Sequence, residues 1–166
     1  QIIEERGTLV AMAARQRAKF EGWLKFELAD KALREGAGEV RVEPVLPGGR
    51  ADLSFVLEGE RHIVELKTPN TNYRIEGVTA LTRPITKNIA SIVADADKLA
   101  RCGGGVIAFI LFPLRPDDRA WESYLLRIGD GIGRSLIVDE HVTRVAIPAT
   151  HADLAIVTFS VEPRRF

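Results

Sequence analysis

Two segments of alternating hydrophobicity, 51–57 and 62–67, constrain the fold of this chain more than any other sequence feature. Within them apolar and polar residues alternate with the period of a half-buried β-strand. The polar connection at 58–60 contains Gly59, and a short connection of this kind between two such segments is typical of a β-hairpin. The chain must therefore build a sheet around this hairpin.

Helical and extended patterns flank the hairpin on both sides. Residues 2–35 lack proline and are rich in Ala, Leu, Lys and Glu, so we predict a helix there, which Gly7 divides into a short and a longer part. An uninterrupted apolar run at 106–111 is typical of a strand buried on both faces. The further helices are predicted at 85–102 and 117–127, and the further strands at 40–45, 142–147 and 154–161.

This order of elements predicts an α/β fold with one mixed β-sheet flanked by helices. The 166 residues suit a single domain spanning 1–166, in which 1–19 form an N-terminal helical extension. The polar stretch 69–84 shows no convincing period and is predicted to be a long loop. Loops of that length in compact domains are usually functional or mobile.

Charge and composition exclude several classes of protein. Lys and Arg number 23, as do Asp and Glu, which excludes a polycationic DNA-coating protein and an acidic disordered tail. A single cysteine excludes an internal disulfide framework and a Cys-rich zinc module. The longest apolar stretch, 106–112, is too short to span a membrane, and no secretion signal is visible. We therefore expect a cytoplasmic protein without membrane attachment.

The alternation also gathers three ionisable side chains of the hairpin. A two-residue turn at Glu58-Gly59 places Asp52 across from Glu65, whereas a turn at Gly59-Glu60 places it across from Lys67. Both registers put Asp52, Glu65 and Lys67 on one face, with directly opposed Cβ atoms about 5 Å apart. A three-residue loop separates them unless a bulge restores the phase.

Two neighbouring carboxylates and a lysine suit one kind of chemistry. The carboxylates repel each other unless a positive charge joins them, and their hard oxygen atoms suit Mg²⁺ or Mn²⁺. Such a metal polarises a phosphate and acidifies a water molecule, while an ammonium group stabilises the negative charge that develops. The alternative role for Lys67, a general base whose pKa the metal depresses, stays open.

Asp52 followed by Glu65-Leu66-Lys67 across a hairpin, with one helix before and one after, resembles the PD-(D/E)XK nuclease superfamily, also called the restriction-endonuclease-like fold. Ala51 stands where the name of the motif has proline. The resemblance covers about residues 20–111, a little over half of the chain. It implies an αβββαβ core, to which this chain adds a C-terminal helix and strands.

The resemblance implies a metal-dependent nuclease that hydrolyses DNA phosphodiester bonds in restriction, repair or defence. Asp52 and Glu65 would then hold Mg²⁺ (or Mn²⁺), and Lys67 would stabilise the transition state. Members often add an acidic residue from the first helix, for which we favour Glu21 over the alternative Glu27. The nucleic-acid contacts that the resemblance implies are Lys25, Arg74, Arg83 and Lys87.

The expected partners follow from the same resemblance. DNA is the substrate, and a homodimer is one arrangement that cuts both strands. Because the net charge is zero, a fused or separate DNA-targeting module is a further expected partner. Two rival functions stay open: a catalytically inactive nucleic-acid- or protein-binding module on the same fold, and an RNA-directed nuclease. Matched DNA and RNA substrates separate the second rival.

Overall fold

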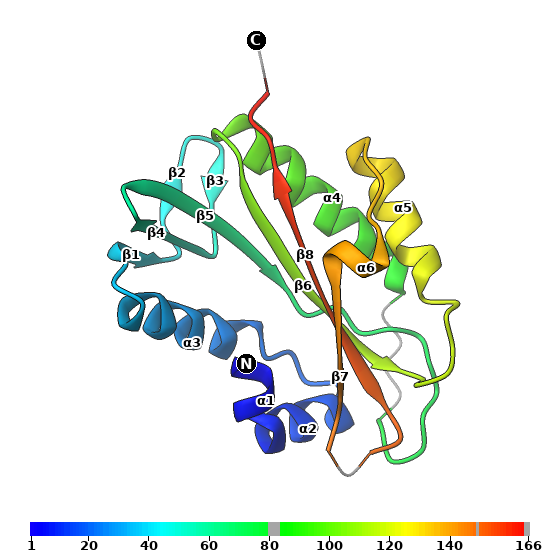
Figure 1. Ribbon diagram of the computed structural model, residues 1–166. Coiled ribbons are helices and arrows are strands. Elements are labelled where there is room, and N and C mark those ends of the chain that lie inside the picture. The colour runs from blue at the N-terminus through cyan, green and yellow to red at the C-terminus, as the bar shows by residue number, and fades with distance from the viewer. Residues whose placement is uncertain (80–83, 149, 165–166) are drawn as a thin grey trace.

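The computed structural model describes residues 1–79, 84–148 and 150–164, and its centre is a six-stranded mixed sheet (Figure 1). The strands lie in the order β1-β4-β5-β6-β8-β7. Strands β5 and β6 are parallel, whereas the other neighbours in this sheet are antiparallel. The strands of this sheet are β1 (Gly38–Val42), β4 (Leu53–Leu57), β5 (Glu60–Lys67), β6 (Gly105–Leu114), β7 (Val142–Ala146) and β8 (Asp153–Val161).

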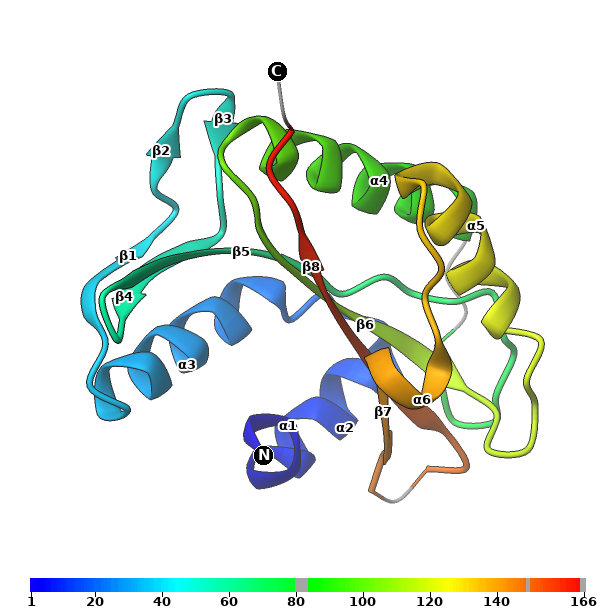
Figure 2. The same ribbon diagram turned by 45° about the horizontal axis from the view of Figure 1, so that its top comes forward.

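Helices cover both faces of the sheet, so the predicted fold class is confirmed in its coarse form as a mixed sheet flanked by helices (Figure 2). One face carries α1 (Ile2–Glu5), α2 (Gly7–Gln16) and α3 (Glu21–Arg34), and the other carries α4 (Ile85–Arg101) and α5 (Glu122–Ile132). The short helix α6 (Val138–His141) precedes β7. Over the described residues, no helix is both long enough and apolar enough to cross a lipid bilayer.

The alternation of side chains along β5 and β6 divides the interior into two cores. Ile63 and Ile107 belong to the core under α4 and α5, whereas Leu66 and Ile110 belong to the core under α2 and α3. Strand β6 contributes buried side chains to both cores, as its uninterrupted apolar sequence predicted. Helices therefore pack against both faces of the sheet at β5 and β6.

The N-terminal helix is not continuous, and the prediction of one helix over 2–35 is wrong beyond its division at Gly7. Helix α2 ends at Gln16, and Arg17 adopts a left-handed conformation with φ of 48°. Arg17 is 4% exposed, and its guanidinium donates to the backbone carbonyls of Thr71 and Tyr73. Contacts with a distant loop, which local propensity does not encode, therefore end this helix before α3 begins.

The fifth helix begins and ends later than predicted, at Glu122 and Ile132 instead of 117 and 127. The glycines at 129 and 131, which lie beyond the predicted end of the helix, are inside it. A Cβ atom on Gly131 would lie 2.6 Å from a methyl group of Val93 on α4. These glycines allow α5 to approach its neighbours closely, which outweighs their low helix propensity.

The predicted strand at 40–45 is divided. Strand β1 ends at Val42, and the chain then forms a small separate hairpin of β2 (Val45–Leu46) and β3 (Gly49–Arg50) before it enters β4. The hairpin lies against the C-terminal part of α4, where Lys98 Nζ donates to the backbone carbonyl of Arg50 over 2.7 Å. The β2–β3 hairpin therefore links α4, through Lys98, to the residues that immediately precede Asp52.

Two glycines with positive φ allow a matched test of this framework. Gly59 (φ 84°) in the β4–β5 turn has open space around its missing Cβ, whereas a Cβ on Gly104 (φ 91°) would lie 2.7 Å from the Val161 carbonyl oxygen. We expect Gly59→Ala to lower the free energy of unfolding by about 1 kcal/mol, because only backbone strain is added. Gly104→Ala should lower it by clearly more. Urea denaturation of both variants checks this, and equal losses would contradict the packing described for Gly104.

Candidate functional site

The hairpin strands separate at one point and leave a fork between β4 and β5. Their pairing ends at Leu53 and Val64, whereas β5 stays paired with β6 as far as Lys67. The turn is Glu58-Gly59, because Leu57 pairs with Glu60. Of the two registers left open by the sequence, the structure thus adopts the one that brings Asp52 level with Glu65.

Two carboxylates occupy the fork where the partner strand is missing. The backbone N–H of Leu66 donates to Asp52 Oδ2 over 2.8 Å, and that of Thr68 donates to Glu21 Oε2 over 3.3 Å. Residues two apart in a strand direct their N–H groups to the same edge, and unpaired N–H groups near the interior need an acceptor. Asp52 and Glu21 therefore lie next to each other along β5 although they come from different elements.

Lys25 lies one helical turn after Glu21 on α3 and forms an ion pair with Asp52. Its Nζ atom is 3.3 Å from Asp52 Oδ1 and 2.7 Å from Glu43 Oε1. Burial lowers the pKa of Lys25, but Glu43 and Asp52 together raise that pKa above its ordinary value. The side chain is 11% exposed. It therefore contacts the carboxylates of this site, whereas its predicted contact with nucleic acid stays a prediction.

Glu65 points to the opposite face of the sheet from Leu66, toward α4, and is 2% exposed. Lys98 Nζ of α4 lies 2.5 Å from Glu65 Oε1. Burial, with smaller contributions from the charges of Asp95 and Asp52, raises the pKa of Glu65 to about 7 against the opposing effect of Lys98. The Glu65 carboxyl thus changes charge near neutral pH.

Lys67 lies between the carboxylates of the fork and the Asp95 carboxylate of α4. Its Nζ atom is 3.0 Å from Asp95 Oδ2 and 3.9 Å from Asp52 Oδ2. Burial lowers the pKa of Lys67, but the charges of Asp95, Glu21 and Asp52 together raise that pKa above its ordinary value. With these neighbours Lys67 carries a positive charge at neutral pH, which suits the stabilisation of an anion better than proton abstraction.

Asp95 and Lys98 of α4 contact Lys67 and Glu65, respectively, and were not predicted from the sequence. Both border the apolar stripe of α4 that includes Ile92, Ala96 and Leu99. Ionisable residues at the border of a buried helical stripe are a signal that could have identified them. Their charges complete a network of five carboxylates (Glu21, Glu43, Asp52, Glu65, Asp95) and three lysines (Lys25, Lys67, Lys98).

Of the remaining predicted residues, Glu27 has partners outside this network. Glu27 pairs with Arg6 over 3.1 Å and accepts a hydrogen bond from the Trp23 indole, so of the two first-helix candidates only Glu21 reaches the fork. Arg74 is exposed in the loop after β5, and Lys87 is exposed on the first turn of α4. Arg83 lies outside the described residues.

A small crevice lies at the end of β5, beside Glu21 and Lys67 of the network. Thr68 lines this crevice and is 2% exposed, and its hydroxyl oxygen has no hydrogen-bond partner among the described residues. A free buried hydroxyl beside Lys67 offers one more polar contact to a molecule that enters. The residues that line the crevice are Lys19, Glu21, Lys67, Thr68, Pro69 and Asn88.

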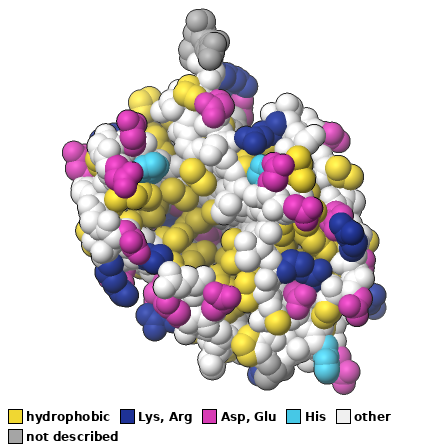
Figure 3. Space-filling model, viewed as in Figure 1, with side chains coloured by type: hydrophobic (Ala, Val, Ile, Leu, Met, Phe, Trp, Pro, Cys, Tyr) yellow, Lys and Arg dark blue, Asp and Glu magenta, His cyan; other side chains and the backbone are white. Residues whose placement is uncertain are grey.

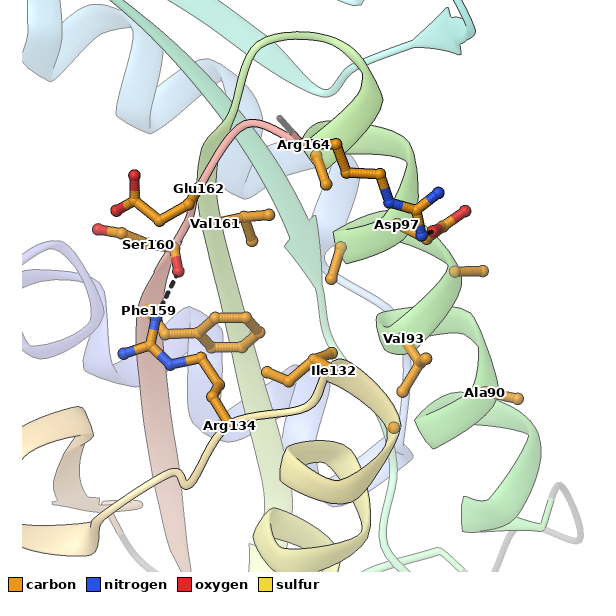
Figure 4. Close-up of a pocket in the computed structure, with 14 residues that line it drawn as sticks. Ala90, Val93, Asp97, Ile132, Arg134, Phe159, Ser160, Val161, Glu162 and Arg164 are labelled. Atoms are coloured by element: carbon orange, nitrogen blue, oxygen red, sulfur yellow. Dashed lines mark hydrogen bonds and ion pairs between the residues drawn. The ribbon is translucent and has the colours of Figure 1, made fainter. Parts of the chain in front are cut away.

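A much larger cavity lies elsewhere, between α4, α5 and the end of β8 (Figure 4). Its volume is about 670 Å³, and its wall includes Val93, Ile132 and Phe159. Arg134 and Arg164 at its edge are held by the Ser160 carbonyl and by Asp97. This cavity is largely apolar and does not include the carboxylates of the fork, so the ionisable network and not this cavity is the candidate site.

The network contains the type of donor atom that a hard divalent cation prefers. Asp52 and Glu65 offer carboxylate oxygens of the type that Mg²⁺ prefers. In the described part of the chain, however, no three His, Cys, Asp or Glu side chains are grouped as ligands of one metal ion. Lysine ammonium groups contact both carboxylates. Mg²⁺ or Mn²⁺ at Asp52 and Glu65 therefore stays a prediction.

The raised pKa of Glu65 predicts a pH dependence of stability. Between the ordinary pKa of 4.5 and about 7, the folded protein binds a proton at Glu65 that the unfolded chain has lost. Stability is therefore lost as the pH rises through this range. We expect Glu65→Gln to gain stability relative to wild type between pH 4 and pH 8, by roughly 3 kcal/mol at most. Urea denaturation at both pH values measures this difference, and a difference that does not change with pH would refute it.

Comparisons with known proteins do not assign a family. Neither a scan against protein-family models nor searches of curated proteins and of solved structures gives a match for this chain.

Proposed function

We propose that this protein is a metal-dependent nuclease that hydrolyses DNA phosphodiester bonds at the fork between β4 and β5. The observation that carries the proposal is the convergence of the hairpin residues. The register of β4 and β5 brings Asp52 level with Glu65, and Lys67 contacts Asp52. Glu21 adds a carboxylate on the same edge of β5. This combination suits phosphodiester hydrolysis, and its resemblance to the PD-(D/E)XK superfamily favours DNA as the substrate.

Each residue has a distinct part in this proposal. Asp52 and Glu65 hold Mg²⁺ or Mn²⁺, which when bound polarises the phosphate and acidifies a water molecule. Lys67 stabilises the negative charge that develops on the phosphate, because its neighbours keep it protonated. Glu21 accepts from the Thr68 backbone N–H and so fixes the end of β5 beside the crevice.

The charge distribution on the surface affects how strongly the protein can bind DNA. Figure 3 shows Lys and Arg side chains interspersed with Asp and Glu over the face in view, and the whole chain has zero net charge. Counterion release from a broad basic surface therefore contributes little to affinity. We infer that exposed residues such as Arg74 and Lys87 supply a few phosphate contacts, and that a homodimer or a DNA-targeting module supplies the rest.

One observation favours a second candidate function. Asp52, Glu65 and Asp95 each have a lysine partner within the protein, as in a purely structural ionic network. An inactive nucleic-acid- or protein-binding module on the same fold is therefore the alternative. The two functions differ in whether the network binds a metal and whether its removal abolishes hydrolysis.

Cleavage assays test the proposal. We expect the wild-type protein to cut plasmid or single-stranded DNA with Mg²⁺ or Mn²⁺, and Asp52→Asn and Lys67→Met to lose about 100-fold or more of this activity, because each removes charge that acts on the phosphate. Matched RNA substrates identify an RNA-directed nuclease. Circular dichroism confirms that each variant is folded.

Two glutamates of α3 provide a matched pair for the same assay. We expect Glu21→Gln to reduce the cleavage rate, because Glu21 lies at the fork, and Glu27→Gln to leave it unchanged, because Glu27 contacts Arg6 and Trp23 instead. Equal rates for wild type, Asp52→Asn and Lys67→Met would place any hydrolysis outside this site. Absence of both cleavage and metal binding would favour the inactive module.

A further inference from the structure

The Lys98 ammonium is surrounded by oxygen atoms from three different elements. Its Nζ atom lies 2.5 Å from Glu65 Oε1 on β5, 3.4 Å from Asp95 Oδ1 on α4, and 2.7 Å from the Arg50 carbonyl oxygen at the end of β3. Two of these oxygens belong to carboxylates. The protein thus builds an oxygen-lined cation position beside Glu65 and fills it with its own side chain.

A divalent ion and the Lys98 ammonium cannot both bind the same carboxylate oxygen of Glu65 at the same time. Mg²⁺ binds carboxylate oxygens at about 2.1 Å, and Lys98 already lies against one oxygen of a carboxylate that is 2% exposed. Two cations at adjacent positions repel each other strongly where water is excluded. Metal binding at Glu65 Oε1 therefore requires the ammonium to move.

The surroundings of Lys98 distinguish it from the other two lysines of the network. Lys67 has Asp95 as its closest carboxylate, and Lys25 contacts Asp52 at the longer distance of 3.3 Å. Lys98 is 17% exposed on its side chain and lies in the last turn of α4. Its flexible four-carbon stem allows the ammonium to leave Glu65 without movement of the helix.

We propose that Lys98 is an internal cation that competes with the divalent metal ion for Glu65 and thereby sets the affinity of the site for metal. This inference rests on the proposed function, because it requires Glu65 to hold the metal. Lys98 supplies a positive charge to the buried Glu65 and its neighbour Asp95 before the metal binds. Its departure then frees both a carboxylate oxygen and a positive charge that can contact a phosphate.

The test measures Mn²⁺ binding to the full chain through the electron paramagnetic resonance signal of free Mn²⁺. Lys98→Met removes the charge and keeps the length of the side chain, and we expect it to bind Mn²⁺ at least tenfold more tightly than wild type. Lys98→Arg restores the charge and should bind like wild type. Lys31→Met, which removes a surface lysine paired with Glu35, is the matched control and should also bind like wild type.

The outcomes separate this inference from the proposed function. If Glu65→Gln abolishes Mn²⁺ binding but Lys98→Met binds no more tightly than wild type, the competition is refuted and the metal site stands. If neither wild type nor Lys98→Met binds Mn²⁺, both the competition and the metal site are refuted. Binding by Lys98→Met alone supports the competition. If circular dichroism shows that Lys98→Met is unfolded, Lys98→Gln replaces it in each comparison. The Gln side chain removes the charge and retains a polar group beside Glu65.

Discussion

The early end of the pairing between β4 and β5 is the constraint on which the site depends. It leaves the backbone N–H groups of Leu66 and Thr68 without a strand partner, and an unpaired N–H near the interior costs free energy. Asp52 and Glu21 supply the missing acceptors as charged groups, which form stronger hydrogen bonds than neutral ones. A requirement of the backbone thus places two carboxylates side by side at the edge of β5.

Concentrating carboxylates in this way has an electrostatic cost, and the lysines offset it. Lys25, Lys67 and Lys98 come from α3, β5 and α4, so the charge balance connects helices on both faces of the sheet to its hairpin. Glu65 is balanced least well, since its burial still raises its pKa to about 7. The arrangement therefore combines a stable fold with one carboxylate whose charge responds to its surroundings. A buried ion-pair network adds little net stability by itself.

The sequence allowed the hairpin, its polar face and the mixed sheet to be predicted, because a period of two residues is encoded locally. The choice between the two registers followed only from the turn at Glu58-Gly59. The break after α2 could not be predicted, since Arg17 ends that helix by binding carbonyls of a loop more than fifty residues away. Asp95 and Lys98 were missed for a similar reason, because their role depends on where α4 crosses β5. Glu21 and Glu27 were both acceptable by sequence, and only the packing of α3 separates them.

We propose above all that Asp52 and Glu65 hold a divalent metal ion at the fork. Crystals of the protein soaked in Mn²⁺ and measured near the manganese absorption edge test it most directly. The account predicts an anomalous difference peak in contact with both carboxylates, with the Lys98 ammonium displaced from Glu65. A well-ordered fork without such a peak, or a peak bound only at other residues, would contradict the account.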